Sequence, residues 1–211
     1  MTVKDALRAA MREHLGPSAR AAGFEGSAPT WRRSNEGGDC AIANVQMSQW
    51  GSRDHGQCYI NLALAPAPWL DFQSRAKPLP KTLSETYGLF RDRLGTVWDI
   101  PSPDAAEPVV LDMLAALERD GWPLLNRLLD RTWFLEYLRT DGLGEIKQAY
   151  GFDKYFAKSE AILLSDDGPS PALDELLDRM TTDLDPTIGK AWLADAAWIR
   201  DRAESRGGAP T

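Results

Sequence analysis

Two strand-like segments and the loop between them decide the fold: residues 39–65 read DCAIANVQMSQWGSRDHGQCYINLALA. Apolar and polar residues alternate on both sides of a glycine-bounded loop at residues 51–56, and the helix signal in both segments is weak. This alternation is typical of an antiparallel hairpin with one buried face and one solvated face. The stretch therefore predicts a small antiparallel sheet with an apolar side and a polar side.

The register of this hairpin follows from asking which pairing places like residues opposite one another. One register does so on both faces. It pairs Ala43 with Leu64, Val45 with Leu62 and Met47 with Ile60 on the apolar face, and Asn44 with Ala63, Gln46 with Asn61 and Ser48 with Tyr59 on the polar face. In this register Cys40 and Cys58 lie too far apart to share a disulfide or a metal ion. We expect both thiols to be reduced.

The polar face supplies the candidate binding residues of the chain. They are Asn44, Gln46, Ser48, Trp50, Tyr59 and Asn61. Amides and hydroxyls aligned across strands can bind a peptide or a small polar ligand. An ordinary solvated or helix-covered sheet face explains the same residues, because a cross-strand Gln–Asn pair can satisfy itself.

The rest of the chain predicts an α+β fold in which helices surround this sheet. The apolar spacing in residues 3–22 indicates an N-terminal helix that ends at Gly23, and residues 30–34 form a short strand. We expect a helix over residues 83–94 and an edge strand at residues 98–100. After the proline-rich stretch 100–108 the period becomes helical throughout.

This change of period divides the chain. We expect an α+β domain with the antiparallel sheet at residues 1–103 and an all-helical C-terminal half at residues 104–205. The second region can also pack with the first as one unit. Residues 206–211 are expected to form a frayed tail.

The N-terminal motifs resemble those of the domain-of-unknown-function family 4304. The resemblance covers about residues 5–70 and rests on Ala22-Gly23-Phe24, Trp31-Arg32-Arg33, Asn44-Val45-Gln46-Met47-Ser48-Gln49-Trp50 and Ile60-Asn61-Leu62. It implies a small bacterial, intracellular α+β domain with an accessory or interaction role. It implies no catalytic residue.

Charge limits the partners that the chain can hold. Residues 1–103 carry 12 basic and 10 acidic side chains, whereas residues 104–211 carry 12 basic and 21 acidic ones, so the second half accounts for the net charge of −7. A net-negative chain without a basic run disfavours nucleic acid and anionic membranes and leaves a basic protein as the expected partner. No stretch approaches the roughly 20 apolar residues of a membrane span, and the charged N-terminus lacks a signal core, so we expect a cytoplasmic protein.

Three further groups have both a functional and a structural explanation. Arg32 and Arg33 can bind a carboxylate or phosphate, or can pair with nearby acids. His14 and His55 can serve as bases, or can be ordinary hydrogen-bonded histidines. The acidic residues of the C-terminal half can bind a cation, or can form a solvated helix face; they are Asp174, Glu175, Asp178, Asp183 and Asp185.

The sequence contains no recognisable catalytic motif and no compact metal-ligand spacing. It therefore predicts no cofactor, no metal site and no catalytic residue. The main hypothesis is a non-enzymatic interaction or accessory protein of the immunity-like kind, which masks a basic partner. The alternative hypothesis is a small-ligand binder or enzyme with its site on the polar sheet face, with His55 as a further candidate. The oligomeric state stays open.

Overall fold

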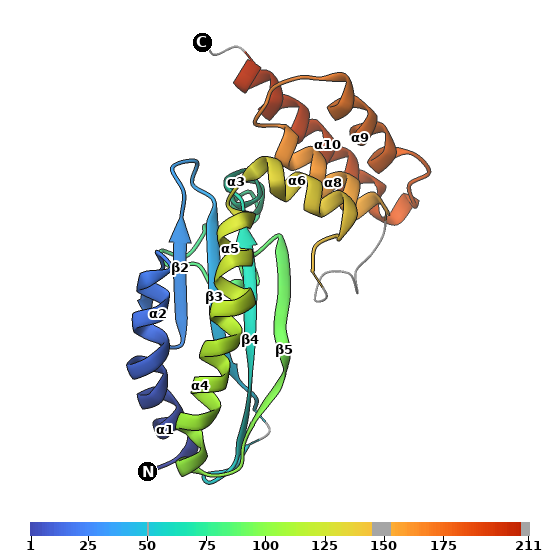
Figure 1. The fold of residues 1–211 in the computed structure, drawn as a ribbon. Coiled ribbons are helices and arrows are strands. Elements are labelled where there is room, and N and C mark those ends of the chain that lie inside the picture. Colours follow the sequence, from blue (N-terminus) through green and yellow to red (C-terminus); the bar gives the residue numbers. More distant parts are fainter. Residues whose placement is uncertain (50, 145–152, 208–211) are drawn as a thin grey trace.

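The computed structural model describes residues 1–49, 51–144 and 153–207 and shows a five-stranded antiparallel sheet with helices on one face and at one end (Figure 1). The strands follow one another in the order β1-β2-β3-β4-β5, so each strand pairs with its neighbour in the sequence. Their bounds are β1 Glu25–Ser27, β2 Thr30–Ser34, β3 Cys40–Met47, β4 Gly56–Ala65 and β5 Phe90–Ile100. The predicted α+β class, with an N-terminal helix, an antiparallel sheet and a helical C-terminal half, is confirmed.

Four helices cover one face of the sheet. They are α1 (Val3–Ala10), α2 (Gly16–Ala21), α4 (Ala106–Ala116) and α5 (Trp122–Leu128), and Figure 1 shows them in front of the strands. The sheet contributes the side chains that alternate toward these helices, such as Val45, Ile60 and Leu62, to the main core. Helix α4 lies directly after β5 and packs on both α1 and β5. Burial of this shared face provides the main stabilisation of the fold.

Local signals explain the N-terminal helix. Thr2 caps α1 through a reciprocal arrangement with Asp5, which satisfies backbone donors at the helix start. A π-helical turn, Met11–Leu15, joins α1 to α2, and Pro17 follows at the start of α2. The chain then leaves the helix at Gly23, whose φ of +86° favours glycine. The predicted end of this helix is therefore confirmed.

The remaining helices form a bundle beyond one end of the sheet (Figure 1). They are α6 (Arg131–Thr140), α8 (Asp153–Leu164), α9 (Pro171–Thr181) and α10 (Pro186–Gly207), and α3 (Ala67–Ser74) lies between this bundle and β4. Aromatic rings fasten α3 to α10, since the Phe72 and Trp198 ring centroids lie 5.4 Å apart. None of the described helices is long and apolar enough to cross a membrane.

A network of charged side chains, with the buried Asp39 at one end, joins the sheet to the bundle. Asp39, just before β3, is 2% exposed and accepts hydrogen bonds from the Arg131 guanidinium and from the Ala67 backbone amide at 2.8 Å. Arg131 also contacts Asp166 at 3.3 Å, and Asp166 in turn accepts from Arg202 of α10 at 2.7 Å. The network therefore fixes where the bundle sits relative to the strands.

Part of the predicted secondary structure is wrong. Residues 83–94 do not form one helix, because a 3-10 turn at Glu85–Tyr87 is followed by β5, which starts at Phe90 and continues through the expected edge strand at 98–100. Pairing along β4 stabilises this segment as a strand despite its mixed charge pattern. Strand β1 was not predicted, and α10 extends to Gly207. Residues 208–211 of the expected tail lie outside the described residues.

Asp39→Ala is expected to destabilise the protein by about 3 kcal/mol or more, because it leaves the Arg131 guanidinium without its main buried partner. Urea denaturation of both proteins measures this difference. The matched control is Arg119→Ala, which breaks an exposed pair with Asp120 (2.8 Å) and should cost less than about 1 kcal/mol. Equal losses in the two variants would show that the Asp39 network is not a major source of stability.

Candidate functional site

The predicted polar residues lie on the side of the sheet opposite to the helices. Asn44 and Gln46 alternate with core residues along β3, and Tyr59 and Asn61 do the same along β4. Ser48 directly follows the end of β3, where its backbone amide donates to Gln57 O at 2.7 Å. Trp50 lies outside the described residues. The structure thus brings four of the six predicted residues together on one face, with the fifth at its margin.

The hairpin register differs from the predicted one by two residues. Ala43 pairs with Leu62, Asn44 with Asn61, Val45 with Ile60, Gln46 with Tyr59 and Met47 with Cys58. A shift of two keeps every side chain on its predicted face, because side chains alternate with a period of two. The loop is shorter than the predicted pairing required, since β4 already begins at Gly56. The predicted cross-strand partners were therefore wrong, whereas each residue was assigned to the correct face of the sheet.

The polar side chains of this face bond mainly to one another. Asn61 is only 2% exposed, and its Nδ2 donates to Gln46 Oε1 at 2.9 Å. Asn44 Nδ2 donates to Thr30 Oγ1 at 2.8 Å. The Arg93 guanidinium lies over the Tyr59 ring, 4.3 Å from its centroid, which is a cation–π geometry. The face is therefore preorganised before any ligand arrives.

One half of this face is more fully covered than the other. Leu83, in the segment before β5, packs on Cys40, Ile42 and Ala63 at the end of the sheet near the bundle. Toward the other end, Gln46 is exposed and Tyr59 is half-buried. Asn44 and Gln46 also border a groove of about 360 Å³ along the edge of β3. This more open half therefore presents Gln46 and Arg93 to solvent around the buried Asn61, and the 3-10 turn at Glu85–Tyr87 packs beside it.

Both histidines pair with carboxylates. His55 Nε2 lies 3.0 Å from Asp99 Oδ1 at the margin of the polar face, and both side chains are about half exposed. His14 Nε2 lies 3.1 Å from Glu107 Oε1, which ties the N-terminal helix to α4. His14 thus has a structural contact between two helices, while the His55–Asp99 pair stands beside the candidate surface.

The two arginines do not pair with acids. Arg32 Nε donates to the backbone carbonyl of Leu83, and Arg33 Nη1 donates to Ala22 O at 3.0 Å and to Asn126 Oδ1 at 2.9 Å. No carboxylate in the described part of the chain forms an ion pair with either guanidinium. The expectation that nearby acids neutralise them is therefore wrong.

The acidic residues of the C-terminal half form an exposed surface. Asp174, Glu175 and Asp178 lie on the outer side of α9, whose inner side buries Leu173 and Leu177. Asp183 and Asp185 follow in the exposed connection to α10. Asp185 accepts from the Thr187 side chain and backbone, and these hydrogen bonds lower its pKa. These carboxylates therefore form an exposed acidic surface on α9 and the segment that follows it.

Both cysteines are free, buried thiols. Cys58 faces the helices and pairs with Met47 at the end of β3. Cys40 lies at the start of β3, seven residues before Met47, and faces the other side together with Ile42. Burial raises the pKa of Cys58 to about 12. Burial also raises the pKa of Cys40, although a hydrogen bond with Ser34 and the charge of Arg32 oppose the shift. The thiolate form, which attacks electrophiles and binds metals, is therefore disfavoured at both positions.

Sequence reasoning missed three features near this face. Arg93 was placed in a helix that does not exist, so its stacking on Tyr59 was not foreseen. Asp39 and its distant partner Arg131 carry no local signal. The third is a hollow between the β1–β2 hairpin and residues 81–83, which joins segments far apart in the sequence.

The fold and the surface define a class of protein: an α+β domain with a helix-covered antiparallel sheet whose opposite face is partly open. The family model of the Domain of unknown function (DUF4304) matches residues 15–127, which is more than half of the chain, and the protein belongs to this family. The suspected resemblance is thereby confirmed. The match reaches beyond residue 70 and includes helices α4 and most of α5. No curated protein and no solved structure matches the chain significantly.

Gln46→Ala is expected to lower the free energy of unfolding by about 1 kcal/mol, because the largely buried Asn61 amide loses its acceptor. Gln46→Glu keeps an acceptor oxygen at the same reach and should cost less. Urea denaturation of the two variants and the native protein measures the difference. If the glutamate variant were the less stable one, the Gln46–Asn61 hydrogen bond would not explain the effect.

The raised pKa of Cys58 predicts a specific pH dependence. Below about pH 9 the thiol is protonated in both states; between about pH 9 and pH 12 only the unfolded chain loses the proton, so the free energy of unfolding falls as pH rises. The contribution approaches about 1.4 kcal/mol per pH unit. In Cys58→Ala the decline should be shallower by this amount, measured by urea denaturation between about pH 8 and pH 11. Parallel pH profiles of the two proteins would contradict the assignment.

Proposed function

We propose that this protein is a non-enzymatic interaction protein of the accessory, immunity-like kind, which holds a protein partner on its surface. The observation that supports this best is the Tyr59–Arg93 stack on the open half of the sheet face. Tyrosine and arginine are the residues that most often dominate binding energy at protein interfaces. Here the stack and the neighbouring Gln46–Asn61 hydrogen bond are already formed, so little side-chain entropy is lost on binding.

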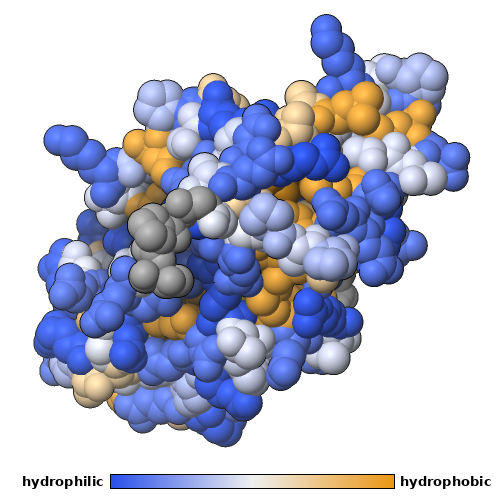
Figure 2. All heavy atoms as spheres, turned by 90° about the horizontal axis from the view of Figure 1, so that it is seen from above, coloured by the Kyte–Doolittle hydropathy of each residue, from blue (hydrophilic) through white to orange (hydrophobic). Residues whose placement is uncertain are grey.

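The chemistry of the proposed partner follows from the acidic surface on α9. Asp174, Glu175 and Asp178 are exposed, and a basic partner would be attracted to them over a long range. Figure 2 shows the molecule from above as mostly hydrophilic, with apolar side chains surfacing in separate areas between polar ones. Charge complementarity is therefore the better guide to a partner on this face. Binding to nucleic acid or anionic membranes is not part of the proposal.

The proposed setting is the bacterial cytoplasm. Two free, buried thiols, Cys40 and Cys58, suit a reducing compartment. The family relationship itself is compatible with such a setting and assigns no activity.

A capture experiment with tagged protein in a lysate of the native host tests the proposal. The first variant combines Asp174→Asn, Glu175→Gln and Asp178→Asn; the second combines Tyr59→Ala and Arg93→Ala. The charge-matched control removes three exposed carboxylates elsewhere, through Asp112→Asn, Asp201→Asn and Glu204→Gln. Each complex is washed at about 50 mM and about 500 mM salt, where the screening length falls from over 10 Å to below 5 Å.

We expect one specific partner with the native protein and the control. It should be lost with the acidic variant or with high salt if α9 provides the contact, and with the Tyr59/Arg93 variant if the sheet face does. A partner that survives every variant and high salt would refute these surfaces. If no partner is captured, the alternative hypothesis of a small-ligand binder or enzyme on the polar sheet face takes precedence.

A further inference from the structure

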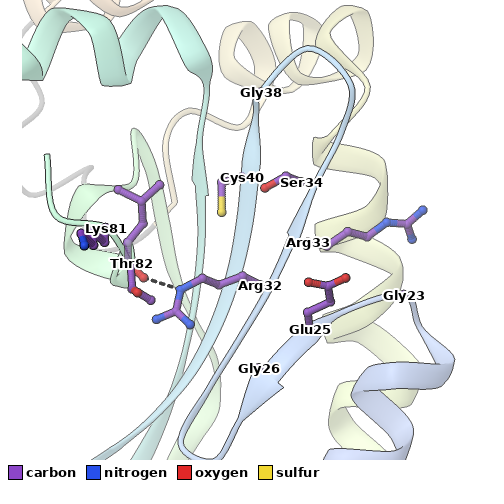
Figure 3. Close-up of a pocket in the computed structure, with 11 residues that line it drawn as sticks. Gly23, Glu25, Gly26, Arg32, Arg33, Ser34, Gly38, Cys40, Lys81 and Thr82 are labelled. Atoms are coloured by element: carbon purple, nitrogen blue, oxygen red, sulfur yellow. Dashed lines mark hydrogen bonds between the residues drawn. The ribbon is translucent and has the colours of Figure 1, made fainter.

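A hollow of about 560 Å³ lies between the β1–β2 hairpin and the segment before the 3-10 turn (Figure 3). Its walls come from three parts of the chain: residues 23–26, the end of β2 with the start of β3, and residues 81–83. This volume is within the range of about 300–1,000 Å³ that small-molecule sites occupy. The hollow is separate from the open half of the sheet face discussed above.

The walls of this hollow include three glycines in left-handed backbone conformations. Gly23, Gly26 and Gly38 all line it with positive φ angles, which favour glycine. At Gly26 a Cβ atom would lie 2.7 Å from the Thr30 carbonyl oxygen of the same hairpin, so the close approach of β1 and β2 requires glycine there. Because β1 pairs only as far as Arg32, the last two residues of β2 also leave their outer edge to the hollow.

Arg32 turns away from the acid that stands opposite to it in the sheet. Glu25 is its cross-strand partner, yet the two side chains form no ion pair. Instead Arg32 Nε donates to the Leu83 carbonyl, and Figure 3 shows the guanidinium reaching across the hollow toward Thr82. The carbonyl fixes the arginine through one of its five N–H donors. The two terminal nitrogens are left as a preformed fork.

A second cationic residue, Lys81, and the hydroxyl residue Ser34 also line the hollow. Lys81 lines the same wall as Thr82, and Ser34 points toward the hollow from β2 (Figure 3). Arg33 points to the opposite side of β2, where it bonds with Ala22 and Asn126. Arg32 and Lys81 therefore give the hollow a positive balance over Glu25.

We propose that this hollow binds a small organic anion that carries a carboxylate or phosphate group. The Arg32 fork matches the planar or tetrahedral oxygens of such a group with two parallel hydrogen bonds, and Lys81 adds a point charge. The site is independent of the partner surfaces proposed above.

The test is a titration of ¹⁵N-labelled protein followed by NMR at constant ionic strength, with sodium chloride replaced step by step. The probes are inorganic phosphate, citrate and, separately, a hexaglutamate peptide. We expect citrate or phosphate to cause saturable shifts at the Arg32 Nε–H and at the backbone amides of residues 32–34 and 81–83. In Arg32→Gln the affinity should fall at least about tenfold, because a charge-assisted fork is lost.

Two further variants keep the result interpretable. Lys81→Gln changes an exposed side chain and so leaves the fold intact; it should weaken binding severalfold even if Arg32→Gln proves unstable. Arg119→Gln removes an equal charge from a distant exposed pair and should leave the affinity unchanged. Shifts that do not saturate, or equal affinities in all three variants, would overturn the proposal. Binding of the peptide alone would overturn the small-molecule assignment.

Discussion

The buried carboxylate of Asp39 is the contact on which the arrangement of the molecule depends. It accepts hydrogen bonds from the first residue of α3 and from Arg131 at the start of α6, and its own backbone amide donates to Asn35 Oδ1 at 2.9 Å. Asn35 in turn donates to the Leu129 carbonyl just before α6. The β2–β3 turn is therefore bonded to the two places where the chain enters the helical bundle.

The contacts of this network close on themselves in a ring, because they return to α3, which also bonds to Asp39. Arg131 shares Asp166 with Arg202, and Arg202 also contacts Asp71 of α3 at 2.7 Å. Each arginine bridges two carboxylates, and Asp39 is the one member of this set that is fully buried, so its charge depends most on its partners. Because the ring sits at the end of the strands, it holds α6 to α10 beyond the sheet and not across its back (Figure 1). The open half of the polar face is a consequence of this placement.

Face assignments could be predicted from the sequence, and contacts between distant segments could not. Alternation along residues 40–47 and 57–65 placed Asn44, Gln46, Tyr59 and Asn61 on one side correctly, because a strand has a period of two. The same period made the register ambiguous, since a shift of two residues costs no change of face. The observed pairing differs in that β4 begins at Gly56 and Met47 lies opposite Cys58, which the alternation does not indicate.

Strand β5 and the Asp39 network escaped prediction for different reasons. In β5 the charged run Arg91-Asp92-Arg93 interrupts the alternation, so apolar spacing alone indicated a helix. Asp39 and Arg131 are 92 residues apart, and an aspartate before a strand has many ordinary explanations. Sequence patterns report which face a side chain occupies, but they do not report which distant charge will meet it.

The adjacent residues Arg32 and Arg33 show how far this rule extends. Alternation sends them to opposite sides of β2, so one motif in the sequence becomes two environments. Arg33 enters the helix-covered side and bonds with the end of α2 and with α5, which makes it part of the packing. Arg32 enters the other side, where none of the described carboxylates forms an ion pair with it and the Leu83 carbonyl holds it in place. Packing therefore explains Arg33, whereas the terminal donors of Arg32 border the hollow. Because only its Nε–H is bonded to the described part of the chain, the Arg32 guanidinium keeps its terminal donors for an anion, and the site proposed for Arg32 rests on this difference.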